Sequence, residues 1–233
     1  MSFKKLSAVS LTDLFVNEIE KLILSDKLKP GDRLPPERQL AQEMDVSLAV
    51  INAGVTRLTA LGFLSIVPRK GTYVADYIRN GNMDTMKEVI ELTGMKIDND
   101  VLDPVALFRL NVEQGAAKAA CQNRNEQDIK RLEELVRQLE EDENVDLAEI
   151  GFEFHHEAAL ASQNLCYPML IQSCKPLYLL FYRMVYSTAG YEIELDFLKR
   201  ICEAIKAQDE EAAAQAIKDS IDFWIDYMNK SKK

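Results

Sequence analysis

The stretch LPPERQLAQEMDVSLAVINAGVTRLTALGFLSIVPRKGTYV, residues 34 to 74, decides the fold of the first part of this chain. Two helix-forming segments, a short turn between them and a basic hairpin follow one another in it. Pro35 and Pro36 suit the first turn of a helix, because a missing N–H costs nothing there. The order predicts a winged helix-turn-helix, an arrangement that places its second helix in the major groove of DNA.

The second helix, predicted over residues 48–61, carries the side chains expected to read bases. Ser47 can cap it by accepting a hydrogen bond from a free N–H of its first turn. Apolar residues recur within it at the spacing of a buried stripe, which turns Leu48, Ala49 and Asn52 outward. The outward residues at the start of a recognition helix meet base edges.

The hairpin after this helix predicts a small β-wing. Short apolar runs on either side of Pro68 read as two strands, so Arg69 and Lys70 lie at the tip of their turn. Phosphate and minor-groove contacts are expected from the wing and from the start of the first helix. The residues expected to contact DNA are Arg38, Ser47, Leu48, Ala49, Asn52, Arg69, Lys70, Gly71 and Thr72.

These motifs resemble the GntR superfamily of bacterial transcriptional regulators, and within it the FadR subfamily. The resemblance rests on Pro30-Gly31 followed by LPPER, on Val46-Ser47 and on the GTYV wing. It implies a homodimer bound to a pseudo-palindromic DNA operator. Family members usually carry guanine-reading arginines at the positions of Leu48 and Asn52. Because the Asn amide pairs well with adenine, we expect an operator richer in A·T at the corresponding positions.

Length and charge predict a two-part regulator. A chain of 233 residues suits one or two domains, and we expect a winged helix-turn-helix over 1–78, a linker with a short helix over 79–100 and a helical domain over 101–233. Net charge is −10, yet residues 1–80 hold 11 Lys/Arg against 9 Asp/Glu, so the acidity lies in the second part. No apolar run approaches the roughly 18 residues of a membrane span. We expect a cytoplasmic protein with no membrane partner.

The second part is predicted to be almost wholly helical. The expected helices cover residues 104–122, 126–142, 146–163, 167–188, 191–208 and 210–230. The predicted fold class is mainly α: an N-terminal winged helix-turn-helix with a small β-wing, followed by an all-α helical-bundle sensing domain. This second part resembles the ligand-sensing FCD domain of the FadR subfamily. The residues expected to bind its effector are Arg109, Glu113, His155, Tyr178, Arg183, Ser220 and Trp224.

Many FCD domains bind a divalent metal through an Asp and three His, and this chain departs from that pattern. By the resemblance, the four ligand positions fall on Gly151, His155, Leu198 and Ser220. Its two histidines, His155 and His156, are neighbours, and neighbours on a helix point about 100° apart. A three-histidine site therefore cannot be built within one subunit, and we expect no bound metal and no cofactor.

The effector class stays open between two alternatives. The chain resembles a metal-free branch of the subfamily that recognises long-chain acyl-coenzyme A, through Ala161-Ser162-Gln163-Asn164, Lys175-Pro176-Leu177-Tyr178 and the Ser220/Trp224 pair. However, Ile217 stands where that branch has a glycine among its ligand contacts. A small carboxylate held by Arg109 or Arg183 is the other candidate.

Two alternative functions for this chain are typical of other classes of protein. A winged helix can serve protein contacts alone, without sequence-specific DNA binding. An enzyme built on the helical domain is the second, but the sequence holds no nucleophile–base motif, phosphate loop or metal set. We therefore expect a regulator and not an enzyme.

Overall fold

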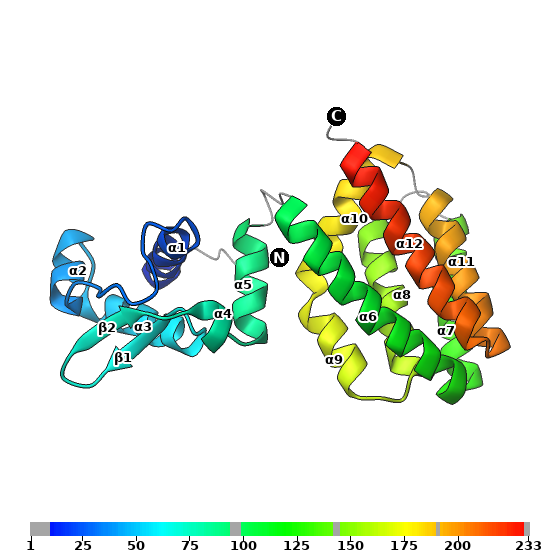
Figure 1. Ribbon diagram of the computed structural model, residues 1–233, viewed down its shortest axis with the longest axis horizontal. Helices are drawn as coiled ribbons and strands as arrows, with labels where there is room; N and C mark the ends of the chain where they lie inside the picture. Colours follow the sequence, from blue (N-terminus) through cyan, green and yellow to red (C-terminus); the bar gives the residue numbers. More distant parts are fainter. Residues whose placement is uncertain (1–9, 94–98, 142–144, 190–191, 231–233) are drawn as a thin grey trace, which may run out of the picture. The chain divides into compact units, whose positions relative to one another are not determined.

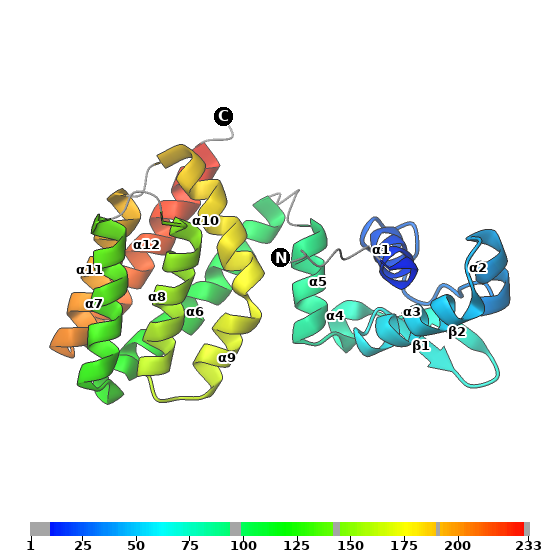
Figure 2. The same cartoon turned by 180° about the vertical axis from the view of Figure 1, so that it is seen from behind.

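The computed structural model describes residues 10–93, 99–141, 145–189 and 192–230. The chain divides into two compact units, Met1–Leu92 and Thr93–Lys233, drawn from two sides in Figure 1 and Figure 2. Each unit has its own hydrophobic core. The first is a winged helix-turn-helix and the second is all-helical, which confirms the predicted fold class.

The first unit contains five helices and a two-stranded sheet within its described residues. Antiparallel pairing sets Leu64 opposite Val74 and Val67 opposite Gly71, so the strands form the predicted wing. The elements are α1 (Leu11–Leu24), α2 (Glu37–Glu43), α3 (Leu48–Ala60), β1 (Leu64–Val67), β2 (Gly71–Val74), α4 (Tyr77–Asn80) and α5 (Met83–Thr93).

A glycine allows α1 and α3 to pack closely in the core of the first unit. Phe15 and Ile19 of α1 are buried with Ile51 and Leu58 of α3. A Cβ added at Gly54 would lie 2.2 Å from Cδ1 of Phe15, which is far too close for any side chain. Gly54 in a helix interior costs about 1 kcal/mol relative to Ala, and this close approach explains its presence.

Helix α5, within the predicted linker 79–100, is fastened to the first unit at its start. The Thr85 hydroxyl donates a hydrogen bond of 2.5 Å to the carbonyl of Leu61, and the Asn82 amide donates one of 3.2 Å to the carbonyl of Ala60. One turn further along, Glu88 pairs with Arg57 of α3 at 3.4 Å. The end of α3 and the start of α5 are therefore held together.

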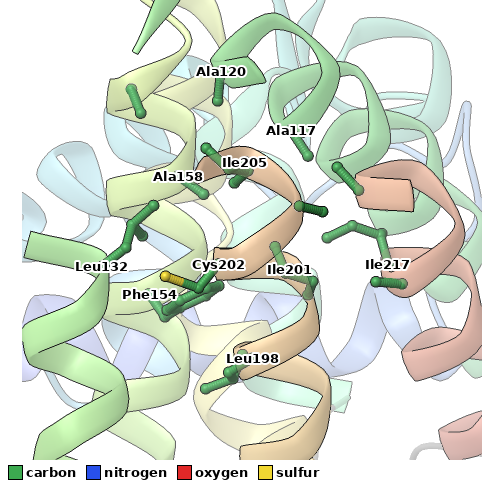
Figure 3. Close-up of a cluster of buried hydrophobic side chains, with 14 of the residues drawn as sticks. Ala117, Ala120, Leu132, Phe154, Ala158, Leu198, Ile201, Cys202, Ile205 and Ile217 are labelled. Carbon is green, nitrogen blue, oxygen red and sulfur yellow. The ribbon is translucent and has the colours of Figure 1, made fainter. Parts of the chain in front are cut away.

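The second unit is a bundle of helices. Helix α12 lies along α6 and α11, while α8 contacts α6, α7, α9 and α10 (Figure 1). Figure 3 shows the core between them, where Leu132, Phe154, Ile201 and Ile217 meet from four different helices. The helices are α6 (Asn99–Asn123), α7 (Glu126–Glu141), α8 (Leu147–Ala161), α9 (Cys166–Ser173), α10 (Lys175–Ala189), α11 (Glu192–Ala207) and α12 (Glu210–Lys230).

Two helix predictions in this unit were wrong in detail. The single helix expected over 167–188 is two helices that break at Cys174, because Pro176 has no N–H to continue the helical bonding. Proline is tolerated in the first turn, where α10 begins. Helix α6 starts at Asn99, earlier than expected. Within the ranges described above, no helix is long and apolar enough to cross a membrane.

Candidate functional site

The start of α3 presents a small exposed surface. Ser47 has extended backbone angles, and its Oγ accepts a hydrogen bond of 3.3 Å from the N–H of Val50, which caps the helix. The buried side of α3 faces α1, so Leu48, Ala49 and Asn52 are exposed. Leu48 is 39% exposed. The residues predicted to meet base edges are therefore accessible at the start of this helix.

The wing presents two cations at its tip. Arg69 and Lys70 are exposed, and Arg69 adopts φ 64°, which shapes the tight turn. Thr72 is by contrast buried, and its hydroxyl donates a hydrogen bond of 3.2 Å to Oε1 of Glu37. Thr72 therefore fastens the wing to the start of α2 through its side chain. Arg38, the next residue of α2, is exposed.

The second unit encloses a cluster of polar side chains from α6, α8, α10, α11 and α12. All its members are buried, although each carries a charge or a hydrogen-bonding group. A buried ion pair persists only when hydrogen bonds satisfy its remaining atoms. We call this group of buried side chains the polar cluster. Its members are Arg109, Glu113, His155, Tyr178, Tyr182, Glu194 and Trp224.

Glu113 lies at the centre of one half of the polar cluster. Its Oε1 accepts a hydrogen bond of 2.7 Å from Nε of Arg109, one turn earlier on α6, and another of 2.5 Å from the Tyr178 hydroxyl. The Arg109 guanidinium also lies 4.2 Å from the centre of the Tyr178 ring. Nδ1 of His155 is 3.2 Å from the other oxygen, Oε2.

Glu194 organises the other half of the polar cluster. Its Oε2 accepts a hydrogen bond of 2.8 Å from Nε1 of Trp224, and its Oε1 accepts one of 3.1 Å from the Tyr182 hydroxyl. The Tyr182 ring stacks on His155 with centroids 6.3 Å apart, so it joins the two halves. Sequence reasoning missed both Tyr182 and Glu194.

Burial and charge set the protonation states in the polar cluster. Burial lowers the pKa of His155 to about 4, so its imidazole is neutral at pH 7. Burial alone would raise the pKa of Glu113, but the Arg109 charge acts together with His155 and with the hydrogen bonds from Tyr178 and Arg109 to keep that pKa below its usual value. Burial raises the pKa of Glu194. The half around Glu113 is therefore an ion pair beside a neutral imidazole.

Two buried atoms of the polar cluster lack a hydrogen-bond partner among the described residues. They are Oε2 of Glu113 and Nε2 of His155. Unsatisfied buried polar atoms are rare and call for an explanation, such as a ligand that supplies the missing bonds.

The remaining predicted effector residues lie outside these bonds. Arg183 is exposed, and Ser220 is buried on α12 one turn before Trp224. At Gly151, where metal-binding relatives carry the Asp, a Cβ would lie 2.8 Å from the Tyr182 ring. An acidic side chain at this position would require the Tyr182 ring to move. Over the described part of the chain, no three His, Cys, Asp or Glu side chains are grouped to hold a metal ion.

Comparison with known proteins identifies both units. Residues 13–74 match the bacterial regulatory proteins of the gntR family, and residues 105–223 match the FCD domain. A fatty acid metabolism regulator protein of Proteus mirabilis is 25% identical over 202 residues, which cover 86% of this chain and 83% of that protein. An uncharacterized HTH-type transcriptional regulator of Bacillus subtilis, YcbG, is 25% identical and covers 86% of this chain and 82% of its own length.

A solved structure shares the fold. Lar of Listeria monocytogenes, described as controlling the expression of the agr system, aligns with a TM-score of 0.59 at 18% identity. The alignment covers 94% of this chain and 97% of Lar. At this identity the likeness concerns the fold alone. With a winged helix-turn-helix that matches the gntR family and a helical unit that matches the FCD domain, the chain belongs to the GntR family of bacterial transcriptional regulators.

Proposed function

We propose that this regulator binds a pseudo-palindromic DNA operator as a cytoplasmic homodimer, and that a small effector in the FCD domain controls its affinity for the operator. The exposed start of α3 and the exposed basic residues at the wing tip support the DNA-binding part most directly. Two winged helices on one duplex would compensate for the weak positive charge of a single one. The segment 79–100 serves as the linker between the DNA-binding domain and the effector-binding domain. The helical domain has no catalytic role.

Asn52 and Leu48 are proposed to read an operator richer in A·T than the usual family site. The Asn52 amide can donate to N7 and accept from N6 of adenine, and Leu48 can pack on a thymine methyl group. The test is selection of bound sequences from a random duplex pool with the full chain. Recovery of a palindrome with A·T at the α3-contacted positions supports the proposal. Recovery of guanines there, or of no common sequence, contradicts it.

For the effector, the geometry favours a small carboxylate that also carries a hydroxyl or ammonium group. Arg109 has five N–H donors, of which Nε–H is bound to Glu113, and a guanidinium pairs well with a carboxylate. The hydroxyl or ammonium group would donate to Oε2 of Glu113 or to Nε2 of His155. Acyl-coenzyme A is the second candidate, supported by the name of the Proteus mirabilis relative.

A thermal-shift screen separates the two effector classes. Hydroxy- and aminocarboxylates, simple carboxylates and acyl-coenzyme A esters would be tested on the full chain and on two variants. His155→Gln removes the unpartnered Nε2 and should abolish the rise in Tm. His156→Gln is the matched control, because the next residue points about 100° away. A shift with acyl-coenzyme A only, or equal responses of both variants, would contradict the small-carboxylate proposal.

A further inference from the structure

A small notch lies between the start of α2 and the tip of the wing. Its volume is about 240 Å³, and it is lined by residues 33–37 on one side and 69–72 on the other. Arg33 stands at its edge, although the sequence patterns did not single this residue out.

The backbone around Arg33 pairs with β2 through a short antiparallel bridge. The N–H of Leu34 donates a hydrogen bond of 2.9 Å to the carbonyl of Thr72, and the N–H of Val74 donates one of 2.8 Å to the carbonyl of Asp32. Arg33 itself bridges to Tyr73 in antiparallel fashion. The position of Arg33 is therefore set by the sheet and not by a free loop.

The Arg33 side chain lies against the bare Cα of Gly71. A Cβ added at Gly71 would be 2.9 Å from Nε and 3.2 Å from Nη2 of Arg33. Gly71 also has φ 125°, a conformation that other residues rarely adopt. Glycine at this position thus shapes the wing turn and leaves room for the guanidinium beside it.

The notch carries an excess of unpaired positive charge. Arg33, Arg69 and Lys70 are exposed, and among the described residues none of them has a carboxylate within ion-pair distance. The acid of the notch, Glu37, accepts a hydrogen bond from Thr72. Three cations around one small recess favour an anion with several acceptor oxygens, and the forked guanidinium of Arg33 matches a phosphate geometrically.

We propose that this notch binds one phosphodiester group of the DNA backbone and that Arg33 is its principal ligand. The inference rests on the proposed DNA-binding function and adds a contact to it. In a helix-turn-helix the first helix crosses the DNA backbone while the second enters the groove. The notch lies at the start of α2, the first of these two helices, where a phosphate is expected.

The test compares the full chain with Arg33→Gln on the selected operator and on a random duplex of equal length. Losing one phosphate contact should reduce the slope of log K against log[salt] by about 0.9 for each bound protomer. By the same relation, affinity at 0.1 M salt should fall about eightfold for each bound protomer on both duplexes, or roughly 60-fold for a bound dimer. Arg33→Lys keeps the charge and should keep most of the slope. Arg79→Gln on α4 removes an exposed charge outside the notch and should leave binding unchanged.

The outcomes are distinct. An unchanged slope and affinity for Arg33→Gln would overturn the proposal, as would a loss confined to the operator, because a phosphate contact is blind to sequence. Titration with inorganic phosphate at constant ionic strength tests a free anion as the alternative occupant. Phosphate binding that Arg33→Gln abolishes while DNA binding is unchanged would also overturn it. Failure of the unaltered chain to bind any DNA would instead refute the proposed function.

Discussion

Glu20 is the least expected residue of the winged helix-turn-helix. Glu20 lies on α1 and is 0% exposed, and neither of its carboxylate oxygens has a hydrogen-bond partner among the described residues. The nearby Arg57 guanidinium is engaged by Asp13 at 2.8 Å and by Glu88 at 3.4 Å. Burial, and then the charge of Glu88, raise the pKa of Glu20 to about 7, although Arg57 opposes the rise.

The first unit should therefore lose stability as pH rises. The folded pKa of Glu20, about 7, exceeds the ordinary 4.5, so the folded state binds more protons between these values. Its contribution is fully present below pH 4.5 and is lost as pH rises through 7, a change of roughly 3 kcal/mol. Hydrogen exchange of α1, corrected for intrinsic rates, measures it at pH 5 and pH 8. Glu20→Gln should remove this dependence.

Glu18→Gln provides the matched control for this experiment. Glu18 is exposed on the same helix, two residues earlier, so removing its charge should leave the pH dependence intact. If Glu20→Gln retained the dependence of the unaltered chain, the buried carboxyl could not be its source.

His155 should stay uncharged over the physiological range. Burial lowers the pKa of His155 to about 4. The neutral imidazole therefore makes its full contribution to the stability of the folded state above pH 6.5, and this contribution is lost as pH falls toward 4. Its NMR imidazole signal, assigned by its disappearance in His155→Gln, should not shift between pH 8 and pH 5.5. A titration of that signal near the ordinary value of 6.5 would show a solvated imidazole and contradict the buried cluster.

The polar cluster also shows what single residues do and do not predict. The resemblance to the FCD domain pointed to Arg109, Glu113, His155 and Trp224, and the structure brings them into one cluster. Glu194 could not be found this way, because it lies two residues after another acid in the first turn of α11. Acids there ordinarily face solvent and favour the helix dipole, and only packing against α10 and α12 identifies Glu194 as buried.

At the scale of elements, α3 and the wing should divide the work of DNA recognition. Asn52→Ala should cost about 1–3 kcal/mol on the operator and relax selection at one base position, because a base-specific pair is lost. Lys70→Ala should weaken binding to the operator and to random DNA alike, and reduce the salt slope by about 1 for each bound protomer. Binding isotherms on both duplexes at several salt concentrations measure these effects. An Asn52→Ala variant that lost affinity equally on both duplexes would refute base reading by Asn52.

Element boundaries were predictable where a local signal marks them. Ser47 caps α3, and Gly62, with φ 75°, lies just after its end, so both boundaries could be read from the sequence. The segment around Cys174 does carry such a mark, since Gln172, Ser173, Lys175 and Pro176 interrupt its apolar residues, yet one helix was predicted instead of two. A proline near a helix start is compatible with either outcome until the packing is known.

At the scale of the whole molecule, the order of the two units along the chain could be predicted from the sequence, because each unit has a different pattern of apolar residues. The first alternates short helices with a hairpin, whereas the second repeats long amphipathic helices such as α7 and α11. Which helices pack together could not be predicted from the sequence. Helices α6 and α12 contact each other, although they are the first and last helices of the second unit along the chain. Amphipathic periodicity says which face is buried and not which neighbour buries it.

A homodimer on a pseudo-palindrome makes a prediction about DNA spacing. Inserting five base pairs between the half-sites of the selected operator turns one half-site by about half a helical turn. Both winged helices of one dimer could then no longer meet their half-sites from the same side. Affinity should fall to that of a single half-site, and sedimentation at saturation should show two protomers on the unaltered duplex. Full affinity after the insertion, or saturation at one protomer, would contradict a dimer whose two winged helices act together.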